Sequence, residues 1–412
     1  MKKSGALNGH LKVNGSKNSI LPILAASLLT REKCKLHEIP DLEDVHVMCD
    51  LLSNLGAKIN KTNNNSLEIQ VENIINYEAP YDLISKLRAS FLVMGPLLSR
   101  INKAKVSMPG GCAIGTRPID LHLKGFKNLN VDINFNRGYI QAQTEDIIGN
   151  NVYLDFPSVG ATENLMMVAC TAKGKTIIEN CAEEPEIIDL ANFINSMGGK
   201  IEGAGTKTIT IIGVDELHGT EYTVIPDRIE AGTYMVAAVL TGGELYIDNV
   251  IPAHVQPVIA KLREVGAEVV ESRNSVMVRS KGMINSTDIK TLPYPGFPTD
   301  MQAQFMLLLS LANGTSVINE TIFENRFMHA NELLRMGANI KIEGNTAIVN
   351  GLNSLTGTKV KATDLRAGAA LILAGLVADG ETEISEIHHI KRGYADIVEK
   401  LQAVGANIAY SM

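Results

Sequence analysis

The sequence predicts a two-domain α/β (α+β) protein built from six similar units of βαβαββ type, with helices buried and sheets outside. Two observations predict this class. First, a pattern of apolar helix, short strand, amphipathic helix, glycine and alternating strand recurs six times along the 412 residues. Second, a chain of this length is too long for one ordinary hydrophobic core. A mixed repeat of 66 to 72 residues is large enough to be a folding unit of its own.

The first helix of each unit is apolar nearly all round, which predicts that it is buried. These helices are expected at Ile20–Leu29, Leu87–Leu98, Ala161–Thr171, Glu230–Leu240, Met301–Leu311 and Leu365–Ala378. The short strands that follow them centre on Leu36, Val106, Ile178, Ile247, Ile318 and Ile384. Each unit therefore places a strand directly after a buried helix.

The second helix of each unit is amphipathic and is expected to end at a residue in the left-handed conformation, which glycine and asparagine favour. These end residues are Gly56, Asn130, Gly198, Gly266, Gly337 and Gly405. Strands with apolar residues at every second position follow, as in Leu67–Val71 and Val276–Val278. This alternation is typical of a sheet with one buried face.

The sixth unit is incomplete, because only about one strand of sequence follows Gly405. The missing strands are expected from the other end of the chain, where 6–15 reads as a hairpin. The predicted domains are therefore 18–226 and 1–17 plus 227–412, each with three units. The chain would cross between them twice, and the cleft beside such a two-stranded hinge is a favoured place for a ligand.

Composition excludes several classes of protein. A formal net charge of −7 and a pI near 5.8 argue against a nucleic-acid-binding protein. The first residues lack the apolar run of a signal peptide, and no apolar segment has transmembrane length. Five scattered cysteines do not form a disulfide framework. A cytoplasmic protein with no membrane contact and no evident obligate protein partner is expected.

The segment 109–118 departs from the repeat and is the first candidate for chemistry. It holds three glycines and two prolines, so it is a loop. In this unit 24 residues separate the short strand from the end of the second helix, whereas in the other units 19 to 21 residues do so. Cys112 lies between glycines in this loop, and Arg117 would stabilise its thiolate if the loop folds back. A mobile catalytic loop is favoured over an ordinary turn with a free surface cysteine.

Several cations lie where an anion would bind. Lys17 and Asn18 precede a buried helix, whose free N–H groups would add to the attraction, although a solvated lysine beside a capping asparagine is the simpler interpretation. Four arginines lie in equivalent units, and two of them begin buried helices, where a charge needs a partner. The four are Arg88, Arg326, Arg366 and Arg392. Each could form an ordinary salt bridge, but together they suggest an anionic substrate.

Two further segments leave both interpretations open. Ser158-Val159-Gly160 precedes a helix and could hold a phosphate or simply cap that helix. Asp300 follows a proline-rich turn at the start of a buried helix and is either a favourable helix charge or a general base. The histidines show no metal-ligand spacing, and His388 and His389 are expected on opposite sides of a strand. No metal site and no dinucleotide fingerprint is predicted.

Taken together, these segments resemble the enolpyruvyl transferases, and the resemblance runs essentially from end to end. The likeness is closest to the branch that acts on UDP-N-acetylglucosamine, and the cysteine loop separates that branch from the sister enzymes that act on shikimate-3-phosphate. The segments that carry it are Gly15–Asn18, Leu87–Ser90, 109–122, Pro298–Asp300, Phe323–Phe327, Asp364–Ala367 and His389–Tyr394.

The resemblance implies an inside-out α/β barrel fold, with two domains of three units that close over the substrate. It also implies a reaction. The enolpyruvyl group of phosphoenolpyruvate moves to the 3-hydroxyl of UDP-N-acetylglucosamine and phosphate is released, which is the first committed step of peptidoglycan synthesis. No cofactor is implied.

The family pattern assigns roles to residues of this chain. Cys112 would protonate the methylene carbon or form a covalent adduct, Asp300 would accept the hydroxyl proton, and Lys17 would also act in catalysis. Phosphoenolpyruvate would be held by Lys17, Asn18, Arg88, Arg117, Arg366 and Arg392. The UDP-sugar would be held by Asn18, Arg88, Arg117, Pro118, Ile119, Asp120, Leu121, Ser158, Val159, Gly160, Asp300, Ile322 and Arg326.

Two departures from the family pattern are visible. Asp155-Phe156-Pro157 stands where some members have a lysine, and Phe91-Leu92 stands where some have a tryptophan. Two other functions were weighed. One is 3-phosphoshikimate 1-carboxyvinyltransferase, and the other is a non-catalytic, repeat-built binding paralogue. The retained Cys112, Asp300 and arginines disfavour the paralogue.

Overall fold

The structure is a computed structural model that describes residues 1–63, 65–108, 114–115 and 119–411. The chain forms two compact units. Unit 1 comprises residues 1–14 and 226–412 together with Ile114 and Gly115, and unit 2 comprises the other described residues between 15 and 225. The two ends of unit 2 meet, because the Ser16 N–H donates to the Ile225 carbonyl oxygen at 2.7 Å.

Unit 2 contains three four-stranded sheets, and each repeat supplies three strands of one sheet. In every sheet the fourth strand comes from elsewhere in the chain and pairs in parallel with the short strand of the repeat. The sheets, in spatial order, are β13 (Glu221–Thr223), β2 (Lys33–His37), β4 (Ser66–Gln70) and β3 (Lys58–Asn63); β5 (Glu78–Ala79), β6 (Lys103–Ser107), β8 (Tyr139–Gln143) and β7 (Asp132–Asn136); and β11 (Lys200–Glu202), β12 (Thr208–Ile212), β10 (Lys175–Glu179) and β9 (Asn151–Tyr153).

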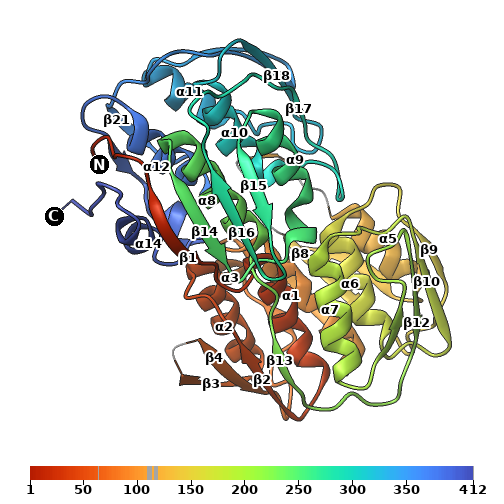
Figure 1. Cartoon of the computed structure of the whole chain (residues 1–412). Helices are drawn as coiled ribbons and strands as arrows, with labels where there is room; N and C mark the ends of the chain where they lie inside the picture. The colour runs from red at the N-terminus through yellow and green to blue at the C-terminus, as the bar shows by residue number, and fades with distance from the viewer. Residues whose placement is uncertain (64, 109–113, 116–118, 412) are drawn as a thin grey trace. The chain divides into compact units, whose positions relative to one another are not determined.

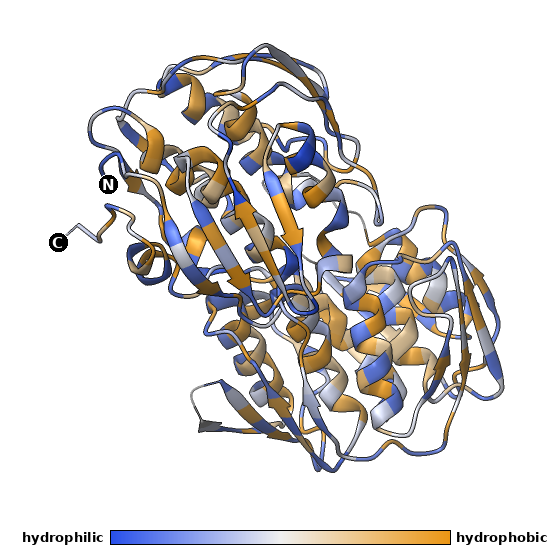
Figure 2. Cartoon of the chain, viewed as in Figure 1, coloured by the Kyte–Doolittle hydropathy of each residue, from blue (hydrophilic) through white to orange (hydrophobic). Residues whose placement is uncertain are grey.

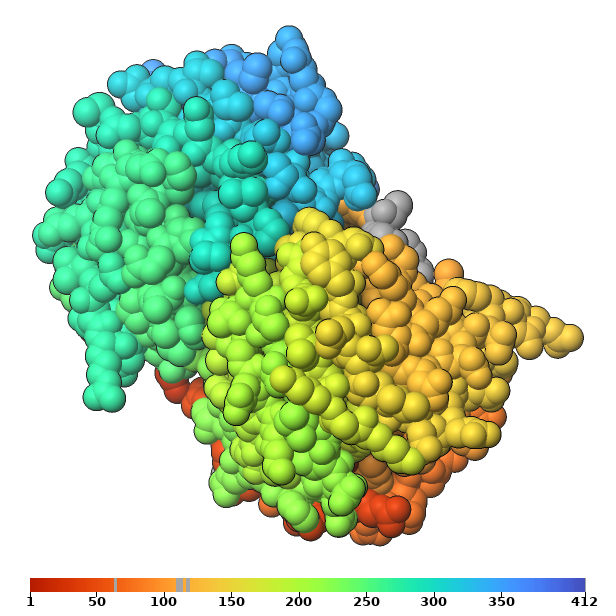
Figure 3. Space-filling model, turned by 90° about the vertical axis from the view of Figure 1, so that its right-hand side faces the viewer, coloured from red at the N-terminus to blue at the C-terminus, as the bar shows by residue number. Residues whose placement is uncertain are grey.

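Strand β13 closes unit 2 by pairing the end of its third repeat with the first. Tyr222 lies opposite Leu36 in the parallel register, and the nearby Gly219 N–H donates to the Glu32 carboxylate at 2.8 Å. In the space-filling view, red residues of the first repeat accordingly lie against green residues near position 220 (Figure 3). The three repeats are thus linked in a ring.

The helices of unit 2 pack inside its sheets, as Figure 1 shows. The apolar helices are α1 (Lys17–Ala26) with η1 (Ser27–Leu29), η2 (Arg88–Val93) with α4 (Met94–Ile101), and α6 (Val159–Ala169). The amphipathic helices are α2 (Glu43–Leu55), α5 (Asp120–Asn128) and α7 (Pro185–Ser196), and α3 (Tyr81–Ile84) is a short additional helix.

Unit 1 repeats this plan with a shortened last sheet. Its sheets are β1 (Asn8–Lys12), β14 (Glu244–Asp248), β16 (Ser275–Arg279) and β15 (Glu268–Glu271); β17 (Ile289–Lys290), β18 (Thr315–Asn319), β20 (Thr346–Asn350) and β19 (Asn339–Glu343); and β21 (Lys359–Lys361) with β22 (Glu383–Ser385). Its helices are α8 (Arg228–Thr241), η3 (Pro252–Val255), α9 (Gln256–Glu264), η4 (Thr299–Met301), α10 (Gln302–Leu309), α11 (Met328–Arg335), α12 (Leu365–Val377), α13 (His388–Lys391) and α14 (Ile397–Ala403).

The predicted fold class is confirmed. The first helix of each repeat is buried along nearly its whole length, and the strands alternate between buried and exposed residues. Figure 2 shows the same contrast, with hydrophobic colour predominating on these helices and alternating along the strands. All six predicted helix ends have positive φ, including Asn130 at 66° and Gly337 at 92°. No described helix is long and apolar enough to span a membrane.

The prediction for the two termini was wrong in detail. Residues 6–15 form no hairpin, because β1 pairs in parallel with β14 of the fourth repeat. No strand follows Gly405 among the described residues, and β21 and β22 form a two-stranded sheet. The N-terminus still contacts the sixth repeat, where Met1 exchanges two backbone hydrogen bonds with Thr382.

Two local predictions were also wrong. The helix expected at 87–98 begins as the 3-10 helix η2 and becomes α-helical at Met94. Pro96 explains the change, because it has no N–H to donate to the carbonyl four residues earlier. His388 and His389 lie on α13 with ring centroids 4.1 Å apart, since the left-handed Glu386 (φ 57°) ends the strand before them.

We predict that alanine is tolerated differently at two of the helix-ending glycines. At Gly337 (φ 92°) a Cβ atom would meet nothing within 4 Å, so Gly337→Ala should cost only the left-handed strain of about 1–2 kcal/mol. At Gly56 (φ 115°) a Cβ atom would lie 2.5 Å from the Asn73 carbonyl oxygen, so Gly56→Ala should cost more. Denaturant unfolding measures both, and equal losses would contradict the packing described for Gly56.

Candidate active site

The predicted residues of unit 1 converge on the carboxylate of Asp300. Arg326 Nη2 donates to Asp300 Oδ1 at 2.8 Å, and Arg366 Nη2 donates to Oδ2 at 2.9 Å. Both arginine side chains are only 4% exposed, whereas the Asp300 side chain is 25% exposed. Two buried cations therefore hold a carboxylate that still reaches solvent.

Arg366 is presented by the start of α12. Asp364 caps this helix, and its carboxylate accepts from the backbone N–H groups of Arg366 and Ala367 at 2.8 and 3.1 Å. Burial opposes the charge on Arg366, but Asp300, Tyr394 and Asp227 together outweigh burial, and the pKa of this guanidinium lies above its ordinary value. Arg366 is therefore a permanent buried cation.

The segment that carries Ile322 and Arg326 is shaped by Glu320, which the sequence prediction missed. Glu320 is buried, and Oε1 accepts from the backbone N–H groups of Ile322 and Phe323 at 2.9 and 3.2 Å. Its Oε2 accepts from the Thr299 hydroxyl, which directly precedes Asp300. One carboxylate thus orders both segments that meet at Asp300. In the sequence, only the neighbouring threonines indicated that Glu320 could accept such hydrogen bonds.

Arg392 lies at the end of α13 and is half-buried. Burial, then the charges of His388 and Arg392, lower the pKa of His389, and Asp364 opposes this effect. Arg392 and the cap of α12 therefore act on the same imidazole. Among the described loop residues, Ile114 is buried in unit 1, where its carbonyl oxygen accepts from the Asn325 N–H at 3.1 Å.

In unit 2, Lys17 begins α1 and forms a buried ion pair. Its Nζ lies 2.7 Å from Asp44 Oδ2, and the two side chains are 12% and 3% exposed. Ser16 caps the helix by accepting from the Ser19 N–H at 3.3 Å, and Asn18 is half-buried in the same turn. Lys17 is therefore not the solvated lysine of the simpler interpretation.

The other predicted residues of unit 2 lie at the starts of helices that pack on one another. Arg88 begins η2, Asp120 begins α5, and Ser158 caps α6 by accepting from the Ala161 N–H at 3.4 Å. Helix α6 packs against both η2 and α5, and η2 packs against α1. The remaining residues of the two predicted phosphate-binding segments are half-buried beside these starts: Ile119, Leu121, Val159 and Gly160.

His122 joins three of these helix starts and was quoted in the sequence without a role. Its Nδ1 lies 3.2 Å from the Asn164 side-chain nitrogen, which also donates to the Phe91 carbonyl oxygen at 3.1 Å. The Asn164 oxygen accepts from the Gly95 N–H at 2.7 Å. A Cβ atom on Gly160 would lie 3.4 Å from the His122 ring. Burial, with help from Arg88, lowers the pKa of His122 to about 3.

Unit 2 also buries an acid that the sequence analysis did not single out. Glu163 lies on α6 next to Asn164, and burial, followed by the charges of Glu186 and Glu184, raises its pKa well above the ordinary value. A glutamate inside an otherwise apolar helix is the signal that could have identified it.

Cys112, Arg117 and Pro118 lie outside the described residues. The other four cysteines are not poised to react: burial raises the pKa of Cys34 and Cys49 to about 11 and that of Cys170 and Cys181 to about 12. Thiolate, the reactive form, is therefore scarce at these four positions near neutral pH.

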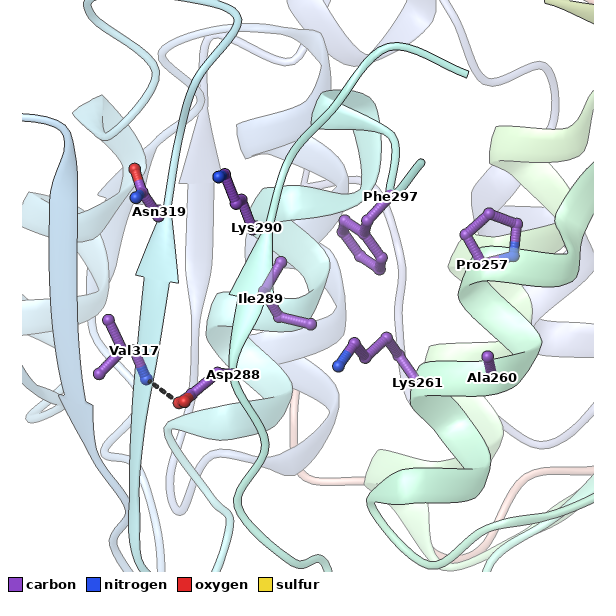
Figure 4. A pocket seen from close by; sticks show the side chains of 9 residues that line it. All are labelled: Pro257, Ala260, Lys261, Asp288, Ile289, Lys290, Phe297, Val317 and Asn319. Atoms are coloured by element: carbon purple, nitrogen blue, oxygen red, sulfur yellow. Dashed lines mark hydrogen bonds between the residues drawn. The ribbon is translucent and has the colours of Figure 1, made fainter. Parts of the chain in front are cut away.

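Two cavities of unit 1 are lined by neither Asp300 nor its two arginines. One, of about 430 Å³, lies between α9 and strands β17 and β18, and Phe297 points into it (Figure 4). Neither of its lysines, Lys261 and Lys290, belongs to the predicted site. The other, of about 550 Å³, lies beside β22 and is lined mainly by apolar residues of the sixth repeat.

The sequence matches one family over most of its length. The family described as EPSP synthase (3-phosphoshikimate 1-carboxyvinyltransferase) matches residues 1–401. UDP-N-acetylglucosamine 1-carboxyvinyltransferase 1 of Caldanaerobacter subterraneus subsp. tengcongensis is 60% identical over 408 residues, which cover 99% of this chain and 98% of that protein. The chain belongs to the enolpyruvyl transferase family. It is therefore a transferase.

Another sequence relative and two solved structures are also enolpyruvyl transferases or carry the name of a member of that family. UDP-N-acetylglucosamine 1-carboxyvinyltransferase of Finegoldia magna is 56% identical over 411 residues, with 99% of this chain and 97% of that protein covered. Among solved structures, the enolpyruvyl transferase NikO from Streptomyces tendae has a TM-score of 0.89 at 24% identity, covering 99% and 97% of the two chains. EPSP synthase from Acinetobacter baumannii has a TM-score of 0.77 at 16% identity, covering 100% and 99%. At these identities the solved structures show the common fold alone.

We predict that His122 makes unit 2 sensitive to acid. An unfolded histidine takes up a proton near pH 6.5, whereas folded His122 does so only near pH 3. Stability should therefore be retained above pH 6.5 and lost as the pH falls from 6.5 towards 3, at up to about 1.4 kcal/mol per pH unit.

Unfolding curves measured across this pH range test the assignment. His122→Asn should flatten the slope, whereas His218→Asn, which removes an exposed histidine of the same unit, should leave it intact. An unchanged slope in His122→Asn would rule out the buried neutral imidazole as its source.

Proposed function

We propose that this protein transfers the enolpyruvyl group of phosphoenolpyruvate to the 3-hydroxyl of UDP-N-acetylglucosamine, with release of phosphate, in the cytoplasm. This is the first committed step of peptidoglycan synthesis. The observation that carries the proposal is the convergence of two buried arginines on the solvent-reaching carboxylate of Asp300. Relatives that are 54–60% identical and bear the name of this activity support the same acceptor.

The reaction needs one proton donor and one proton acceptor. The hydroxyl oxygen bonds to C2 of phosphoenolpyruvate while its proton passes to Asp300, and the methylene carbon takes a proton from Cys112. The resulting tetrahedral ketal then returns a proton from its new methyl group to the Cys112 thiolate as its bond to phosphate breaks, which restores the double bond. Cys112 is alternatively the site of a covalent adduct with the same substrate.

The cations hold the anionic groups through this sequence. Phosphoenolpyruvate carries a phosphate and a carboxylate, and both suit arginine forks. In this proposal the phosphate and carboxylate contact Lys17, Asn18, Arg88, Arg117, Arg366 and Arg392. The same charges stabilise the ketal as it forms. The sugar contacts Asn18, Asp300, Ile322 and Arg326, and the uridine diphosphate contacts residues 117–121 and 158–160.

Asp300 can accept a proton only when its arginines release it. Both of its oxygens accept hydrogen bonds from guanidinium groups in the structure. An incoming phosphate or carboxylate competes for Arg366, and one oxygen of Asp300 then faces the hydroxyl. In this proposal, substrate binding thereby frees one oxygen of Asp300 to accept the hydroxyl proton.

The family description leaves shikimate-3-phosphate as the second candidate acceptor. Against it stand the cysteine loop and the low identity, 16%, to the EPSP synthase of Acinetobacter baumannii. We predict phosphate release from phosphoenolpyruvate with UDP-N-acetylglucosamine and none with shikimate-3-phosphate, measured side by side. Release only with shikimate-3-phosphate would reverse the assignment, and no release from folded protein with either acceptor would refute it.

We also predict that an epoxide such as fosfomycin alkylates Cys112 alone. The other four thiols have raised pKa values and supply little thiolate. Intact-mass measurement should show one adduct, peptide mapping should place it on Cys112, and Cys112→Ser should remain unlabelled. Modification at Cys49 with Cys112 untouched would count against the role assigned to the loop.

A further inference from the structure

A buried polar network lies behind Arg366, on the side away from Asp300. Arg366 Nη1 donates to the hydroxyl of Tyr394 at 3.3 Å, and that hydroxyl lies 2.9 Å from the hydroxyl of Thr233. The Gln304 side-chain nitrogen lies 3.1 Å from Thr233 Oγ1 and 3.3 Å from Tyr394 Oη. All four side chains are buried, and they come from α8, α10, α12 and the turn after α13.

The hydrogen bond from Thr233 to a backbone carbonyl oxygen sets the direction of this network. The Thr233 hydroxyl donates its single proton to the Ile229 carbonyl oxygen at 2.8 Å, one turn earlier on α8. Thr233 Oγ1 must therefore accept from Tyr394. Because the Tyr394 proton is used in that bond, the lone pairs of its oxygen are left for Arg366 and Gln304. Burial raises the pKa of Tyr394, which keeps the phenol protonated.

Arg366 is consequently held at both ends of its planar head. Nη1 is fixed by the oriented phenol, and Nη2 reaches Asp300 at 2.9 Å. We propose that Tyr394, oriented by Thr233 and Gln304, is a positioning residue that fixes Arg366 for its exchange between Asp300 and the anionic substrate. This inference rests on the proposed function for the roles of Arg366 and Asp300.

The alternative to a positioning role is that the network only stabilises the fold. Buried polar groups that satisfy one another stabilise a core whether or not the neighbouring arginine binds substrate. The two functions differ in their consequences. A purely structural hydroxyl would change the melting temperature and leave the kinetics of folded protein unchanged. A positioning hydroxyl changes the handling of phosphoenolpyruvate in protein that is still folded.

The experiment compares Tyr394→Phe, Thr233→Val and the double variant with a matched control. Tyr234→Phe is that control, because Tyr234 is the next residue on α8, is equally buried and donates to Glu230 rather than contacting Arg366. Tyr394→Phe should lower kcat/KM for phosphoenolpyruvate by roughly tenfold to a hundredfold, since a hydrogen bond to a charged group is lost. KM for UDP-N-acetylglucosamine should stay within about twofold, as should all constants of Tyr234→Phe.

The double variant tests whether the residues act as one chain of hydrogen bonds. Thr233→Val removes the acceptor that orients Tyr394, so the double variant should be no worse than Tyr394→Phe alone. The proposal would be overturned if the losses of kcat/KM in the two single variants multiplied in the double variant. A folded Tyr394→Phe protein with unchanged kcat/KM would also overturn it.

Failure of the proposed function would look different, because wild-type protein would then release no phosphate. In that case crystal structures of wild type and Tyr394→Phe decide the positioning role. Displacement of the Arg366 head from Asp300 in the variant supports it, and an unmoved head refutes it.

Discussion

The carboxylate of Asp300, shared between Arg326 and Arg366, is the interaction on which the described chemistry of unit 1 depends. Two buried guanidinium groups would be costly without a counter-charge, so Asp300 makes their burial possible. One carboxylate thus serves as the counter-charge to both buried cations in the described part of unit 1.

The supporting residues share one design. Glu320 orders the segments that carry Thr299 and Ile322, and Asp364 orders the start of α12. In unit 2, Asn164 performs the corresponding task by linking His122, Phe91 and Gly95. Each is a polar side chain that bonds to backbone groups, and Glu320 and Asn164 are buried. The predicted binding segments are thereby held in place by hydrogen bonds from their backbone to neighbouring polar side chains.

The sequence predicted the repeat and its buried helices well, because apolar periodicity and helix-ending residues such as Asn130 are local signals. Strand partners were harder, since β1 pairs with β14 across more than 200 residues and nothing local specifies this choice. Arg326, Arg366 and Asp300 were identified individually, but their mutual bonds required the fold. Glu320 and Tyr394 stayed without a role because burial, which gives them one, depends on segments far away in the chain.

The order of the sheets has a consequence for how the chain folds during synthesis. Strand β13 closes unit 2 on its own first repeat, so every strand of that unit has been made by the time residue 225 leaves the ribosome. Strand β1 precedes β14, its parallel partner, by 236 positions. It therefore stays unpaired while the whole of unit 2 is synthesised, and during that interval the nascent chain carries a free strand edge.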